Sequence, residues 1–221
     1  MSVRALIFDF DGLLLETEWP LFESWRETFA RHGVDLTIEE WSASIGTVDQ
    51  FDPMEELERR TGLLLEREAV QLDRRARRDE LIASLPVCSG VREILEEAGS
   101  HRLRVAVASS SSLEWVESHL RRLGLDGFFS YLSCFDGSCS AKPYPDLYLR
   151  ALDALGVPAH HCVAFEDSHN GLLAAKAAQL RCVVVPTPMT RHMDFSLADL
   201  VVRDLGGQSL LDLLRTIDGA E

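Results

Sequence analysis

Short apolar runs recur along the chain and alternate with segments of helical periodicity. The runs typical of buried strands span residues 4–10, 103–108, 131–135, 162–165, 181–185 and 200–202. Continuous apolar runs of this length, bounded by turn residues, are typical of strands buried on both faces. The helical patterns between them span residues 91–98, 113–123, 146–155 and 172–179. This alternation predicts an α/β fold with a Rossmann-like, doubly wound parallel sheet and helices on both faces.

The alternation is interrupted between residues 15 and 85, where the patterns are helical throughout. The expected helices there span residues 20–31, 38–44, 54–60 and 66–84. We therefore predict an α/β core made of residues 1–14 and 86–221, with residues 15–85 inserted as a helical cap domain. Four arginines of the last helix (Arg74, Arg75, Arg77 and Arg78) lie among acidic residues. Opposite charges at this spacing favour a solvated helix face, with a phosphate-binding patch as the alternative.

Composition narrows the range of partners and locations. The 221 residues are 46% hydrophobic and 26% charged, which is ordinary for a globular protein. The net charge of −14 argues against nucleic acid or an anionic membrane as the main partner. No apolar run is long enough to span a bilayer, and the N-terminus lacks a signal cleavage region, so we expect a cytoplasmic protein. The sequence does not indicate an oligomeric state, although a monomer is compatible with it.

Candidate chemistry begins where the first predicted strand ends, at Asp9 and Asp11. In open parallel sheets, ligands bind beyond the carboxyl ends of the strands, so both carboxylates fall where a site is expected. Spacing of two along an extended chain predicts that they lie on the same side of the strand. Such a pair is also common in ordinary turns, since Asp and Gly are standard turn residues.

Polar segments follow two more of the predicted strands. Four serines (109–112) follow the strand at 103–108, and Ser111 and Glu114 have the spacing of a helix capping box. Glu166 and Asp167 follow the strand at 162–165. Adjacent acids that face Asp9 would repel it unless a cation held them, and hard oxygen ligands suit Mg²⁺.

A lysine lies in a proline-braced loop between these segments. Lys142 and Lys176 are the only lysines in the chain, and Lys142 is followed by Pro143 and Pro145. Prolines at these positions restrict the backbone and open the next helix. Lys142 is therefore the better candidate for a lysine with a chemical role.

In this order on successive strands, the four segments resemble the haloacid dehalogenase (HAD) superfamily over nearly the whole chain. The similarity is greatest to the branch with a helical cap after the first strand, which includes β-phosphoglucomutase-like enzymes and many sugar-phosphate and nucleotide phosphatases. The resemblance implies a Mg²⁺-dependent phosphatase. It implies that the chain hydrolyses a small phosphorylated metabolite, a sugar phosphate or nucleotide-like phosphomonoester, through an aspartyl-phosphate intermediate.

The resemblance also implies roles for individual residues. Asp9 matches the nucleophile, Asp11 the general acid and base, and Lys142 the lysine that offsets phosphate charge. The Ser109 hydroxyl and the Ser110 amide match the phosphoryl-binding groups. The implied magnesium ligands are three carboxylates and one backbone carbonyl: Asp9, Glu166 and Asp167, with the carbonyl of Asp11.

Departures from relatives separate the possible reactions. Asp11 argues against dehalogenation, and the absence of lysine from the predicted cap excludes a phosphonatase that forms a Schiff base. The β-phosphoglucomutases have an arginine in a cap loop that corresponds here to residues 46–49, and a histidine where this chain has Leu21. Without these extra anion ligands, hydrolysis is favoured over a mutase reaction. A catalytically silent module that binds a phosphorylated metabolite is the second alternative.

Several further positions bear on substrate contacts and on helix ends. Glu16 stands where most members have Asp, at the predicted junction of core and cap, and Gly171 stands where some have a third acid. His169 and Asn170 are expected to cap a helix. Residues 18–25 and 46–51 are expected to form the specificity wall. Trp19, Phe22 and Trp25 are expected to pack between cap helices, with stacking on a substrate as the alternative.

Overall fold

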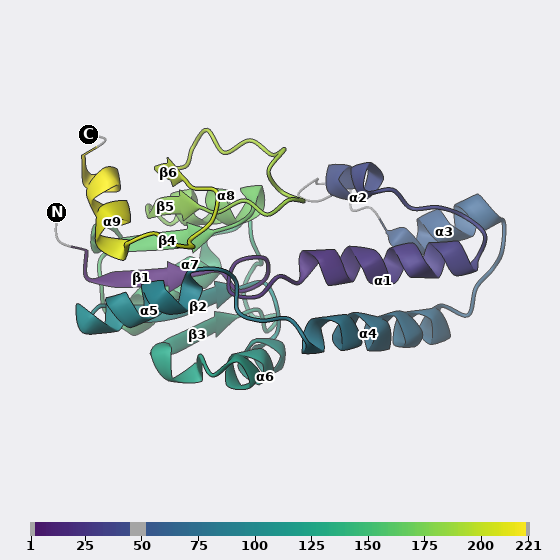
Figure 1. Cartoon of the computed structure of the whole chain (residues 1–221), viewed down its shortest axis with the longest axis horizontal. Coiled ribbons are helices and arrows are strands. Elements are labelled where there is room, and N and C mark those ends of the chain that lie inside the picture. The colour runs from purple at the N-terminus through teal and green to yellow at the C-terminus, as the bar shows by residue number, and fades with distance from the viewer. Residues whose placement is uncertain (1–2, 45–51, 220–221) are drawn as a thin grey trace. The chain divides into compact units, whose positions relative to one another are not determined.

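A six-stranded parallel sheet forms the centre of the larger part of the chain (Figure 1). The computed structural model describes residues 3–44 and 52–219. The strand order is β3-β2-β1-β4-β5-β6. The strands are β1 (Ala5–Phe8), β2 (Arg104–Ser109), β3 (Tyr131–Cys134), β4 (Cys162–Glu166), β5 (Arg181–Val184) and β6 (Leu200–Val201). The chain winds outward from β1 to β3, then returns to β4 on the other side of β1. The predicted doubly wound α/β fold is confirmed, and its topological switch point lies between β1 and β4.

Helices cover both faces of this sheet. They are α5 (Val91–Ser100), α6 (Leu113–Leu123), α7 (Asp146–Leu155), α8 (His169–Ala177) and α9 (Leu210–Asp218). The apolar sides of α7 and α8 pack on the central strands in one buried cluster. On the other face, α5 packs on β2 and α6 on β3. This arrangement buries each central strand on both sides, as its continuous apolar sequence predicts.

The two-residue period of a strand decides which side chains meet which helices. Ala5 and Ile7 of β1 belong to the cluster under α7 and α8, so Leu6 and Phe8 point to the opposite face. There Phe8 lies directly across from Phe165 of β4, with ring centroids 4.7 Å apart and nearly parallel planes. Both rings are fully buried. This pair therefore joins the two strands between which the chain reverses direction.

Residues Glu16–Leu85 form a second compact unit, distinct from the unit made of Met1–Leu15 and Pro86–Glu221. Its helices are α1 (Glu18–Arg31), α2 (Ile38–Ser44), α3 (Pro53–Thr61) and α4 (Arg67–Ala83). Within it, α1 packs against α4. Phe22 and Trp25 are buried in this unit, as predicted, whereas Trp19 is 49% exposed.

The arginine-rich stretch of α4 is not the uniformly solvated face that its charge pattern predicts. Arg74 is buried, and its guanidinium lies 5.0 Å from the centre of the Trp25 ring. Burial lowers the pKa of Arg74 to about 10. Arg77 instead forms an ion pair with Glu27 of α1, at 2.9 Å. The charge pattern could not separate these two arginines, because the difference depends on where Trp25 of another helix lies.

Glu16 holds the start of α1. Its Oε1 accepts hydrogen bonds from the backbone N–H groups of Glu18 at 3.0 Å and Trp19 at 3.1 Å. Thr17, at the position before the helix, makes no side-chain capping bond. The Glu16 side chain therefore satisfies two of the first-turn N–H groups that a helix start leaves without intrahelical partners.

Among the described residues, every helix is either too short or too polar to cross a membrane.

The stacked phenyl rings are expected to be a main source of stability in the core. Phe165→Ala should lower the free energy of unfolding by about 3–5 kcal/mol, because it removes a buried ring and leaves a cavity. Leu149→Ala is the matched control, since Leu149 of α7 is 49% exposed and should change that energy by less than about 0.5 kcal/mol. Urea unfolding of both variants measures the difference. Equal losses of unfolding free energy in the two variants would contradict the stabilising role of the stacked rings.

Candidate active site

Asp9 and Glu166 lie at the carboxyl ends of β1 and β4, on the same face of the sheet. The Asp9 N–H donates to the Phe165 carbonyl at 2.9 Å, which extends the β1–β4 ladder by one residue. Asp9 therefore shares a face with Ile7, and Glu166 shares it with Ala164. That face is the one covered by α7. The strand period thus directs both carboxylates toward the segment that contains Lys142.

Lys142 joins these two carboxylates. Its side chain is only 6% exposed, and its Nζ forms ion pairs with Asp9 and, at 2.6 Å, with Glu166. The ammonium–carboxylate attractions raise the pKa of Lys142 above its ordinary value despite its burial. The predicted lysine therefore lies at the predicted nucleophile.

Tyr148 is a further site residue that the sequence analysis missed. It is fully buried in the first turn of α7, and its hydroxyl donates to Glu166 Oε1 at 2.5 Å. Its ring centre lies 5.2 Å from Lys142 Nζ. The sequence feature that could have identified Tyr148 is its position among apolar residues of the helix just after Lys142. A tyrosine in such a place is buried, and its hydroxyl usually needs a polar partner.

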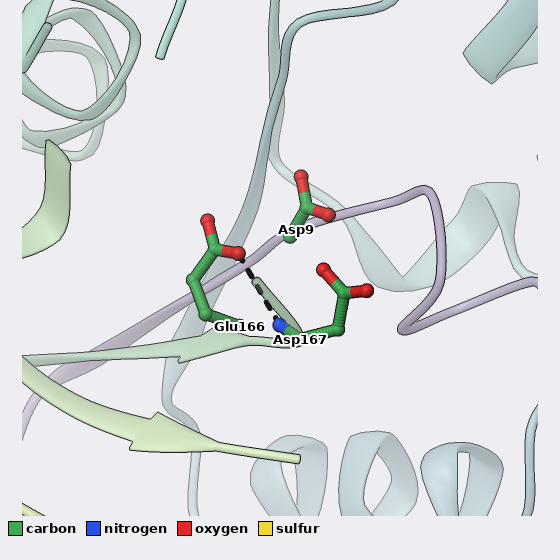
Figure 2. A group of neighbouring side chains, drawn as sticks. All are labelled: Asp9, Glu166 and Asp167. Atoms are coloured by element: carbon green, nitrogen blue, oxygen red, sulfur yellow. Dashed lines mark hydrogen bonds between the residues drawn. The ribbon is translucent and has the colours of Figure 1, made fainter. Parts of the chain in front are cut away.

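Asp167 completes a group of three buried carboxylates. Ligand atoms of Asp9, Glu166 and Asp167 all lie within 4.8 Å of one another. Figure 2 shows these side chains projecting from the ends of β1 and β4 toward a common space. Lys142 supplies one positive charge to three carboxylates. A cluster of this composition retains excess negative charge in a desolvated place, which is costly without another cation.

The pKa of Asp9 reflects that imbalance. Burial raises it from its ordinary value of 3.8 to about 8, with Glu166 and Asp11 adding repulsion and Lys142 opposing both effects. Burial and mutual repulsion destabilise the ionised carboxylates, and a bound cation would offset both effects. Oxygen ligands of this kind suit a hard divalent cation such as Mg²⁺. The residues present therefore fit the predicted metal.

Two glycines let the backbone approach these acids closely. A Cβ on Gly171 would lie 1.9 Å from Glu166 Oε2, and one on Gly12 would lie 2.2 Å from Asp167 Oδ2. Gly12 also has a positive φ of 83°, which favours glycine. The Glu166 carboxylate thus occupies the space that a larger residue at 171 would need.

Asp11 has a different environment from Asp9. Its Oδ2 accepts hydrogen bonds from Ser111 Oγ at 2.6 Å and Ser109 Oγ at 3.4 Å, and its Oδ1 accepts one from Trp115 Nε1 at 3.1 Å. Strand β1 ends at Phe8, so the alternation of a strand does not extend to Asp11. Asp9 and Asp11 have separate hydrogen-bond partners, and their placement on one side of the strand stays a prediction.

Ser109 and Ser110 lie at the end of β2. Ser109 is buried, and its Oγ accepts a hydrogen bond from the Ser111 N–H at 3.0 Å. The Ser110 Oγ accepts one from the Lys142 N–H at 3.3 Å. These contacts bring the two predicted phosphoryl-binding residues beside Asp11 and the backbone of Lys142.

The helix caps differ from those predicted. Ser112, not Ser111, caps α6, with its Oγ accepting from the Trp115 N–H at 3.3 Å. The Ser111 hydroxyl instead donates to Asp11 at 2.6 Å.

Helix α8 begins at His169, three residues before the predicted start. Its cap is Ser168, whose Oγ accepts from the Gly171 N–H at 3.2 Å. His169 and Asn170 are therefore helical residues and not caps. The Nδ1 of His169 instead lies 2.6 Å from the carbonyl oxygen of Asp194. The predicted loop at residues 46–49, and the wall segment 46–51, lie outside the described residues.

Comparison with known proteins gives the family. The haloacid dehalogenase-like hydrolase family matches residues 3–179. The chain is 39% identical over 212 residues to YhcW of Bacillus subtilis (strain 168), named as a candidate phosphatase, with 96% of each chain covered. It is 34% identical over 219 residues to hexitol phosphatase B of Escherichia coli (strain K12), covering 96% of this chain and 97% of that protein.

A solved structure agrees with these relatives. CbbY from Rhodobacter sphaeroides, in complex with xylulose-(1,5)bisphosphate, matches with a TM-score of 0.76 and 33% identity, covering 93% of this chain and 96% of that one. The chain belongs to the haloacid dehalogenase-like hydrolase family. The predicted resemblance to the haloacid dehalogenase superfamily is confirmed, and so is the predicted class of enzyme, a phosphatase of this family.

Close packing at Gly171 gives a structural test of the site. Gly171→Ala should lower the free energy of unfolding by about 1–3 kcal/mol, because the new methyl group collides with the buried Glu166 carboxylate. Gly99→Ala is the matched control, because Gly99 lies in α5 with nothing within 4 Å of the added atom. It should leave stability unchanged or raise it by up to about 1 kcal/mol. Denaturant unfolding compares them, and a neutral Gly171→Ala would contradict the described packing.

The raised pKa of Asp9 predicts a pH dependence of stability in the absence of divalent cations. Between pH 3.8 and about 8 the folded protein holds the Asp9 proton more tightly than the unfolded chain does. Its contribution to the free energy of unfolding is therefore fully present at low pH and is lost as pH rises toward 8. Unfolding in EDTA should show a smaller decline over this range for Asp9→Asn than for the wild type. Asp212 is exposed, so the control Asp212→Asn should retain the wild-type decline in stability. If Asp9→Asn also showed the wild-type decline, the pH dependence would not come from Asp9.

Proposed function

We propose that this protein hydrolyses a small phosphomonoester by transferring its phosphoryl group to Asp9 and then to water. The observation that carries the proposal is the pairing of Asp9 with the buried Lys142, beside Glu166 and Asp167. A sugar phosphate is the favoured substrate class. It is supported by the names of relatives: one is a hexitol phosphatase, and another has been solved with xylulose-(1,5)bisphosphate.

The carboxylates of Asp9, Glu166 and Asp167, with the backbone carbonyl of Asp11, would hold Mg²⁺. When bound, this ion offsets the charge that accumulates when an anionic nucleophile meets a phosphate dianion. Lys142 supplies the second positive charge through its ion pairs with Asp9 and Glu166. Tyr148 fixes the Glu166 carboxylate by donating to its Oε1.

The chain's own residues account for both half-reactions. In the first, a carboxylate oxygen of Asp9 bonds to phosphorus while the bond to the substrate oxygen breaks, and Asp11 gives its proton to that leaving oxygen. In the second, Asp11 takes a proton from water, whose oxygen bonds to phosphorus as the Asp9–phosphorus bond breaks. Inorganic phosphate leaves, and Asp9 and the protonated Asp11 are regenerated.

The two lysines provide a matched test of this proposal. With Mg²⁺ present, Lys142→Ala should lower kcat/KM for phosphate release by about 10²–10³-fold, because it removes a preorganised charge at the phosphoryl group. Lys176→Ala should retain activity, since Lys176 pairs with Asp199 at 2.7 Å and not with the acidic cluster. Asp9→Asn should abolish turnover, and EDTA should do the same to the wild type. A Lys142→Ala variant as active as Lys176→Ala would contradict the proposal.

A panel of phosphorylated sugars, hexitols and nucleotides, scored by released phosphate, identifies the substrate and separates the alternatives. Conversion of one glucose phosphate isomer into another without phosphate release would indicate the mutase. Binding of phosphorylated sugars without turnover, in wild type and Asp9→Asn alike, would indicate a silent binding module.

A further inference from the structure

The carboxylate of Asp11 is held by three donors from a single short segment. Ser109 and Ser111 both contact Oδ2, whereas Trp115, through its indole N–H, contacts Oδ1 at 3.1 Å. The two oxygens of Asp11 are therefore not equivalent. One faces two hydroxyl groups and the other faces an indole.

The indole itself has little freedom to move. The backbone N–H of Trp115 is bound by the Ser112 cap, which fixes this residue in the first turn of α6. One turn later, the His119 ring lies edge-on to the indole, with centroids 4.3 Å apart and planes at 73°. Trp115 is also partly buried. Its N–H is thus presented to Asp11 by a helix start and not by a flexible loop.

The different donors at Oδ1 and Oδ2 bear on which oxygen of Asp11 carries a proton. An indole N–H can only donate a hydrogen bond, whereas a serine hydroxyl can donate or accept. Oδ1 must therefore remain an acceptor for as long as Trp115 contacts it. The unprotonated oxygen is the stronger acceptor, so this contact favours a proton of Asp11 on Oδ2, beside Ser109, whose hydroxyl is the predicted phosphoryl-binding group.

We propose that Trp115 is a positioning residue that orients Asp11 so that Oδ2 delivers and recovers the proton during phosphoryl transfer. This inference rests on the proposed function, because it assigns Trp115 a part in the same reaction. Removing an outer-shell partner of a metal-ligating residue typically costs about 10–100-fold in activity, and Asp11 is such a residue in the proposed site through its backbone carbonyl. Trp115 was not singled out in the sequence, since a tryptophan at the start of a helix resembles any core residue.

The kinetic test uses two probes that differ in their need for a proton. The leaving group of p-nitrophenyl phosphate is a stable anion, whereas the alkoxide of glucose 6-phosphate must be protonated. Trp115→Phe keeps the ring and removes the N–H. It should lower kcat/KM for glucose 6-phosphate about tenfold, mainly through kcat, and lower that for p-nitrophenyl phosphate less than about threefold. Trp41→Phe, which alters a buried tryptophan in the other unit, should leave both values unchanged.

A spectroscopic measurement tests the hydrogen bond between Trp115 and Asp11 without requiring enzyme activity. The chain has four tryptophans, so the indole N–H resonance of Trp115 can be assigned by its loss in Trp115→Phe. In Asp11→Ala this resonance should shift more than the other three, because its acceptor is gone.

The outcomes separate this inference from the proposed function. If the wild type is active, an unmoved Trp115 resonance in Asp11→Ala would overturn the positioning role alone. Equal losses of kcat/KM on both probes in Trp115→Phe would do the same. A wild type inert toward every phosphate tested with Mg²⁺ would overturn the proposed function and the catalytic part of this inference with it.

Discussion

The structure around β1 and β4 depends on an imbalance of buried charge. Three carboxylates, those of Asp9, Glu166 and Asp167, lie within 4.8 Å of one another, while Lys142 contributes a single ammonium group. Isolated buried charges cost several kcal/mol each, so the site persists only if its neighbours restrain the carboxylates until a cation and a phosphate enter. Restraint comes from the Tyr148 hydroxyl and from backbone packed tightly at glycines. The same imbalance that makes this cluster costly also makes it able to bind a cation.

Topology brings these residues together from distant parts of the chain. Asp9 lies 133 residues before Lys142, which is itself 24 residues before Glu166. The strands β1 and β4 are nevertheless neighbours, because the strand order reverses between them. Parallel strands place their carboxyl ends on one edge, and the two-residue period points Asp9 and Glu166 to the face under α7. The polypeptide therefore needs no special loop to assemble the acids. It needs only a matching register on two adjacent strands.

Sequence patterns predicted the fold better than they predicted the partners of individual side chains. The bounds of α2, α6 and α7 match the predictions, because apolar periodicity and the residues at helix ends are local signals. Tertiary contacts caused the differences. Ser111 was expected to cap α6 but binds Asp11, Arg74 was expected in solvent but packs on Trp25, and Tyr148 was overlooked because its partner is on another element. A side chain with two possible partners cannot be assigned from spacing alone.

The contrast between the two aspartates supports a division of roles between them. Asp9 lies among charges, with an ammonium on one side and carboxylates on the other, which suits a group that must remain anionic as a nucleophile once a cation is present. Asp11 accepts hydrogen bonds from neutral donors, two hydroxyl groups and an indole. Neutral hydroxyls can reverse direction when a proton arrives or leaves, so this environment tolerates both states of a general acid and base. Two carboxylates with different surroundings can thus perform different chemistry within one site.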